Sequence, residues 1–141
     1  MNVLNLTPHK IVVYDGEGDK ILKEYEPHGF VVRLKSATQK VCHSASLTYS
    51  VPICDPQRFI DIILPPDEKV LQSADAIIVS APVGQYFMDE FQTSEFCPSY
   101  DVLGPDTGPQ SVLRDDKGNI KGVTRLNLYV KAPNGRKRSV Q

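Results

Sequence analysis

The chain has 141 residues, of which 40% are hydrophobic and 23% are charged, a composition typical of a globular protein and not of a disordered one. Its 16 Lys and Arg against 17 Asp and Glu leave a formal net charge of −1, which argues against binding to duplex nucleic acid or an anionic membrane. No apolar stretch approaches the roughly 18 residues of a membrane span, and we expect neither a signal peptide nor a membrane partner.

The cysteines also indicate a cytoplasmic protein. There are three of them, Cys42, Cys54 and Cys97, without a C-x-x-C pair. This odd number suits neither a disulfide framework nor a zinc ribbon, so we expect reduced thiols and no metal or cofactor.

The N-terminal part of the chain is predicted to be a β-meander. Short β-rich runs cover residues 3–6, 11–14, 21–25 and 30–34. Pro8 lies between the first two runs and cannot donate to a ladder, so a bend or bulge is expected there. Polar turn sequences at 15–19 and 26–29 separate the remaining strands.

The middle of the chain predicts one strand that leads directly into one helix. Residues 36–50 are rich in Ser and Thr and read as a loop, 59–64 as a strand, and 67–73 as a helical turn or short helix. The apolar run 76–79 is typical of a buried strand. We expect Ser80 to be the N-cap of a helix over 83–91, whose apolar residues recur at helical spacing.

The C-terminal part predicts a structured loop and a closing β-hairpin. Two Gly-Pro steps lie in the connection 97–109, and the arms 111–114 and 122–131 flank a turn at 115–119. We therefore expect an α/β fold of the β-rich α+β kind, with a mixed or antiparallel sheet, one principal helix and a C-terminal β-hairpin. One globular domain is predicted over 1–132, and a basic flexible tail over 133–141.

The turn before the helix is the first candidate binding site. Free N–H groups at a helix start can hold phosphate, and Gly84 would let a ligand approach closely. The segment from Ser80 to Gly84 matches no P-loop, dinucleotide fingerprint or hydrolase elbow. The alternative is that Ser80 only caps the helix.

His9 and the loop around Asp106 and Thr107 are the other candidates. His9 follows a proline at a strand break and could act as acid, base or phosphate donor, or it could simply bond to a neighbouring turn. Asp106 and Thr107 lie between two Gly-Pro steps. The carboxylate could bind ribose hydroxyls, or it could organise the loop through an Asx-turn.

Four arginines on or beside predicted strands could supply a counter-charge for phosphate: Arg33, Arg58, Arg114 and Arg125. For any one of them, lying across an exposed sheet face is favoured. His28 and His43 have weaker claims because they fall in a turn and in a polar segment. A thiol enzyme at Cys42 and His43 is disfavoured, since neighbouring residues of a strand point to opposite faces.

Several segments together resemble a group of uncharacterised small bacteriophage and bacterial proteins. They are the N-terminal Asn-Leu-Thr-Pro-His run at 5–9, the run 75–80, and the Pro-Asp-Thr-Gly-Pro loop at 105–109. They also include Arg114-Asp115 and the run 118–123, so the likeness covers nearly the whole chain in order. It implies a viral accessory protein that acts in the host bacterial cytoplasm, and by analogy of context one that counters host defence by capturing a nucleotide immune signal.

The sequence therefore favours a non-enzymatic binder of a small phosphorylated or nucleotide-like ligand. Assembly into a homo-oligomer is a further expectation. We expect its ligand-binding residues to be Thr7, His9, Ser80, Gly84, Asp106, Thr107 and Arg114. One alternative is an enzyme that cleaves or rearranges such a nucleotide, with His9 and Asp106 as the catalytic pair. The other is a protein-interaction module that inhibits a host protein through a sheet edge or the basic tail.

Overall fold

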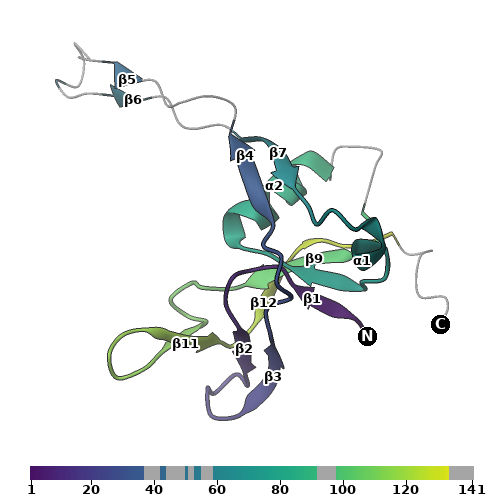
Figure 1. Cartoon of the computed structure of the whole chain (residues 1–141). Coiled ribbons are helices and arrows are strands. Elements are labelled where there is room, and N and C mark those ends of the chain that lie inside the picture. The colour runs from purple at the N-terminus through teal and green to yellow at the C-terminus, as the bar shows by residue number, and fades with distance from the viewer. Residues whose placement is uncertain (37–41, 44–49, 51–52, 55–58, 92–97, 134–141) are drawn as a thin grey trace. The chain divides into compact units, whose positions relative to one another are not determined.

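The computed structural model describes residues 1–36, 42–43, 50, 53–54, 59–91 and 98–133 (Figure 1). Its contacts divide the chain into two compact units. We call Met1–Val32 with Leu64–Gln141 the main unit, and Arg33–Ile63 the inserted unit. The expectation of a single domain over 1–132 stays a prediction, and all but the first residue of the tail expected over 133–141 lies outside the described residues.

The main unit is built on a mixed four-stranded sheet that carries several of its most buried residues. Its strands follow the order β1 (Val3–Asn5), β8 (Ala76–Ile78), β9 (Asp101–Pro105) and β12 (Leu126–Val130). The first three run parallel to one another, and β12 runs antiparallel to β9. Ile77 and Val102 are register partners in the centre and are fully buried. This arrangement confirms the expected β-rich fold with a mixed sheet.

The principal helix, α2 (Ala81–Phe91), contacts β9 and β12. Val83 and Phe87 are four residues apart and both buried, as the helical spacing predicts. The ring of Phe87 meets that of Tyr100 edge-on, with centroids 6.5 Å apart. The helix begins two residues earlier than the sequence indicates.

The short helix expected near 67–73 is α1 (Glu68–Gln72). Its N-cap is Asp67, whose carboxylate accepts a hydrogen bond from the Lys69 amide at 3.0 Å. Leu71 is the buried residue of this helix. The first backbone N–H groups of a helix have no acceptor within the helix, and the Asp67 side chain supplies one for α1.

A second four-stranded sheet of the main unit joins two hairpins (Figure 1). One hairpin pairs β2 (Ile11–Tyr14) with β3 (Ile21–Tyr25), and the other pairs β10 (Val112–Arg114) with β11 (Ile120–Val123). The inner strands β2 and β11 meet in parallel at Val13 and Val123. Residues distant in sequence thus form one continuous surface.

Three expectations about individual strands were wrong. Residues 101–105 form β9 instead of a loop, because they are paired on both sides by β8 and β12. The arm expected over 122–131 is divided between β11 and β12, which belong to different sheets. The strand expected over 30–34 is β4 (Arg33–Ser36), since the Val32 amide instead bonds to the Leu6 carbonyl at 3.1 Å.

The inserted unit contains two antiparallel pairs. β4 pairs with β7 (Phe59–Ile63), and β5 (Cys42–His43) pairs with β6 (Ile53–Cys54). The backbone register sets Cys42 opposite Cys54. Much of the loop predicted over 36–50 lies outside the described residues, as does Arg58.

Candidate functional site

Asn5 at the end of β1 organises the N-terminal bend. Its side chain is 1% exposed, and its amide nitrogen donates to the carbonyls of His9 and Tyr25, both at 2.8 Å. Its oxygen accepts from the Thr7 amide at 3.0 Å and the Thr7 hydroxyl at 2.6 Å. Three of these bonds lie within the bend and the fourth joins it to the end of β3, so Asn5 fixes the path of the chain through Pro8.

Thr7 stabilises the backbone of the bend before His9. It is buried, and its hydroxyl lies within hydrogen-bond distance of both Asn5 and the His9 carbonyl, at 2.6 and 3.0 Å. A hydroxyl in these contacts holds the backbone under His9. The structure thus gives Thr7 a role in shaping the bend.

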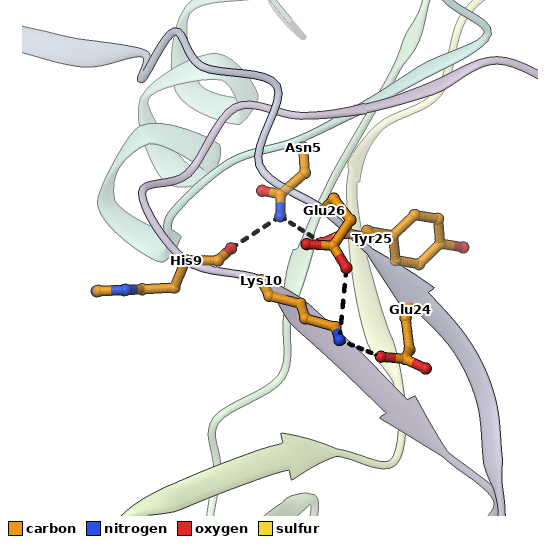
Figure 2. Close-up of polar contacts among 6 residues, drawn as sticks. All are labelled: Asn5, His9, Lys10, Glu24, Tyr25 and Glu26. Atoms are coloured by element: carbon orange, nitrogen blue, oxygen red, sulfur yellow. Dashed lines mark hydrogen bonds and ion pairs between the residues drawn. The ribbon is translucent and has the colours of Figure 1, made fainter.

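The imidazole of His9 points away from this cluster, as Figure 2 shows. Only its backbone carbonyl takes part in the bonds to Asn5 and Thr7. Among the described residues, no side chain or backbone group hydrogen-bonds to the ring. His9 is exposed, and its ring nitrogens are therefore available to a ligand.

Lys10 is held by two glutamates of the neighbouring strand and turn (Figure 2). Its ammonium forms an ion pair with Glu24 and a second with Glu26 at 3.4 Å. Hydrogen bonding to Glu24, followed by the charge of that carboxylate and the contacts with Glu26, raises the pKa of Lys10 above 10.5. The charge of this lysine is neutralised locally.

The carboxylate of Asp106 organises the loop after β9. It accepts hydrogen bonds from the Arg125 Nε at 2.7 Å, the Ser111 hydroxyl at 2.9 Å and the Gly108 amide at 3.0 Å. These bonds correspond to the Asx-turn alternative. The hydrogen bond from Arg125, aided by the Gly108 amide and the Ser111 hydroxyl, lowers the pKa of Asp106 from 3.8 to about 2.

A cavity of about 270 Å³ lies between the second sheet and this loop. Its walls come from the bend and β2, from the end of β9 and its loop, and from β11. The lining residues are His9, Lys10, Ile11, Val12, Pro105, Thr107, Ile120, Lys121, Gly122 and Val123. His9 and Thr107, which lie far apart in sequence, therefore share one cavity.

The lining is mainly apolar with cationic residues, and it includes no carboxylate. Thr107 and Lys121 are exposed, and Ile120 keeps 52% of its surface exposed although it is a large aliphatic residue. Lys121 places its ammonium 5.3 Å from the centre of the Tyr14 ring. Such a site suits an apolar body that carries a negative charge.

The other predicted residues do not line this cavity. Gly84 is buried in α2, and a Cβ there would lie 2.3 Å from two ring atoms of Tyr129, so an aromatic ring fills the space expected for a ligand. Ser80 precedes α2 and accepts the Gly84 amide through its carbonyl at 2.8 Å. Arg114 donates to the Gly118 carbonyl at 2.8 Å and so closes the turn of the β10–β11 hairpin.

Sequence reasoning missed Asn5 and Lys121. Asn5 carries a recognisable signal, because an Asn before Thr-Pro at a strand end can bond to its own bend. Lys121 follows a hairpin turn and has no local feature that distinguishes it from other surface lysines. Arg125 was expected to lie across a sheet face, and it bonds to Asp106 instead.

Among residues 1–36, 42–43, 50, 53–54, 59–91 and 98–133, no group of three or more His, Cys, Asp or Glu side chains could hold a metal ion. No helix in this part of the chain is long and apolar enough to cross a membrane. Comparison with known proteins gives no match: no family model, curated protein or solved structure is significantly similar to the chain.

Proposed function

We propose that the protein binds a small phosphorylated or nucleotide-like ligand in the cavity shared by His9 and Thr107, and releases it unchanged. The observation that carries this proposal is the lining itself, which combines apolar walls with cationic residues and no carboxylate. An apolar cavity with few polar groups is the usual form of a small-molecule site.

The size of the cavity limits the ligand. Ligand pockets commonly measure about 300–1,000 Å³, so the cavity of about 270 Å³ lies just below that range. It suits one ring system with an attached charged group. A larger nucleotide signal, such as one captured by a phage accessory protein during host defence, would insert one unit and leave the rest outside.

Binding is favoured over catalysis because the expected catalytic pair is not assembled for proton transfer. The Asp106 carboxylate already accepts three hydrogen bonds, and the cavity lining does not include it. A base needs a partner within hydrogen-bond reach of the group that it activates. His9 is therefore proposed as a hydrogen-bond donor to the ligand's anionic group.

The test uses AMP, adenosine and inorganic phosphate as probes, with titration followed by amide NMR spectra. We expect AMP to bind more tightly than either fragment and to shift the amide signals of Thr107 and Lys121. His9→Leu removes the ring donor and should weaken AMP binding about tenfold or more, because a hydrogen bond to a charged group contributes about 1.5–3 kcal/mol. His28→Leu is the matched control, since His28 is exposed and lies outside the cavity.

Three results would contradict the proposal. The first is that none of the probes shifts any signal from the cavity residues. The second is that the two histidine variants bind AMP equally well. The third is conversion of AMP to a product that His9→Leu no longer forms, which would establish the enzyme alternative.

A further inference from the structure

Lys121 is the one uncommitted ammonium of the cavity. Lys10 also lines it, but Glu24 and Glu26 hold the charge of that side chain. Within the part of the chain that the structure describes, no carboxylate forms an ion pair with Lys121. The contact that Lys121 does make is with the face of the Tyr14 ring, 5.3 Å from its centre.

The Tyr14 ring lies close against Gly122, a cavity-lining residue of β11. A Cβ at Gly122 would lie 2.5 Å from the Tyr14 Cε1 and 2.7 Å from the Val12 carbonyl oxygen. Only glycine leaves room for so close an approach of the ring to β11. The glycine thus admits the Tyr14 ring beside Lys121, whose ammonium lies over it.

We infer that Lys121 is the residue that neutralises the ligand's anionic group, and that it leaves the Tyr14 ring to do so. This inference rests on the proposed function, which it deepens by naming the charge contact. An exposed cation–π contact is worth about a two- to fivefold factor in an equilibrium constant. A charge-assisted hydrogen bond to phosphate contributes about a 10- to 100-fold factor in an equilibrium constant. The ammonium of Lys121 therefore binds the ligand in preference to the Tyr14 ring.

The competition gives two variants opposite effects. Lys121→Met removes the charge and should weaken AMP binding about tenfold or more, while adenosine binding changes little. Tyr14→Leu removes the resting contact and should strengthen AMP binding about two- to fivefold, because the free protein no longer retains the ammonium. A residue that only packed beside the cavity would not produce opposite signs.

The matched control is Lys117→Met, which removes the same charge from the adjacent hairpin turn, outside the cavity. Amide NMR spectra establish that each variant is folded. A second measurement uses the native chain alone: AMP should shift the ring protons of Tyr14, which the spectrum of Tyr14→Phe identifies.

The outcomes separate the two proposals. If AMP binds the native protein but Lys121→Met and Lys117→Met bind it equally, the inference about Lys121 is wrong and the proposed function stands. Weaker binding by a folded Tyr14→Leu, or an unchanged Tyr14 ring signal, would overturn the competition. If AMP does not bind at all, the proposed function fails and this inference fails with it.

Discussion

Replacing Asn5 with alanine should destabilise the main unit strongly. The buried amide makes four hydrogen bonds, and its removal leaves the Thr7 N–H and the Tyr25 carbonyl without these partners. The His9 carbonyl still has the Thr7 hydroxyl at 3.0 Å. Stranding a buried polar group costs about 1–3 kcal/mol, so two groups give about 2–6 kcal/mol. We expect the lower half of that range, because Tyr25 is only half-buried.

The assay is equilibrium unfolding in urea followed by circular dichroism. With a slope of about 1–3 kcal/mol per molar, the unfolding midpoint of Asn5→Ala should fall by about 1 M or more. Asn119→Ala is the control, since Asn119 is exposed in the β10–β11 turn and bonds there through its backbone. The reasoning is refuted if Asn5→Ala loses less than about 0.5 kcal/mol, the range of ordinary surface substitutions.

The isosteric Asn5→Asp change tests the direction of these bonds. It keeps an acceptor toward Thr7 and places a carboxylate oxygen against the carbonyls of His9 and Tyr25. Repulsion between these oxygens should make the loss of stability larger at pH 7 than at pH 3, where a protonated carboxyl can donate one bond. An equal loss at both pH values would mean that the amide nitrogen contributes little.

Two further predictions concern the loop after β9 and helix α2. Because the Asp106 pKa in the fold is about 2 and its ordinary value is 3.8, its ionised form stabilises the fold above about pH 4, and this contribution is lost as the pH falls toward 2. Thermal melts should show that Arg125→Met loses less stability than the native protein between about pH 4 and pH 2. Parallel stability profiles of the two proteins would contradict the assignment of this loss to the Asp106–Arg125 contact. Gly84→Ala should cost about 1–3 kcal/mol by overpacking against Tyr129. Urea unfolding should show most of that cost disappearing in a Tyr129→Leu background, and an unchanged cost there would exclude the clash.

Local patterns predicted the elements that are defined by their own residues. The apolar run at 76–79 and the helical spacing of Val83 and Phe87 are confirmed by β8 and α2. In both segments the apolar pattern of the sequence matches the residues that the fold buries. The short helix α1 follows equally local signals, an N-cap aspartate and one buried leucine.

β9 was missed because its end carries residues that usually interrupt strands. Pro105 is tolerated since the pairing with β8 ends at Leu103, and only β12 continues alongside to Pro105. Gly104 is required where a Cβ would lie 2.8 Å from the Val79 carbonyl oxygen. These reasons depend on neighbouring strands, which a local pattern does not contain.

The candidate site was predicted only in part for the same reason. His9 and Thr107 were chosen from local features, and the structure places both in one cavity. The wall formed by β11, with Ile120 and Lys121, arises because β11 pairs in parallel with β2, a contact between segments far apart in sequence. The choice between ribose binding and loop organisation for Asp106 likewise depended on the distant Arg125.

The chain passes from the main unit into the inserted unit at Arg33 and returns to the main unit after Ile63. Arg33 and Ile63 are register partners at the base of the β4–β7 ladder, so the two junctions are neighbouring strand residues. The chain between them can consequently change in length at little entropic cost, since doubling a loop adds only about 0.6 kcal/mol. This makes the β4–β7 ladder a suitable site for replacing the inserted segment with a fluorescent reporter or an affinity tag, because every residue that lines the cavity belongs to the main unit.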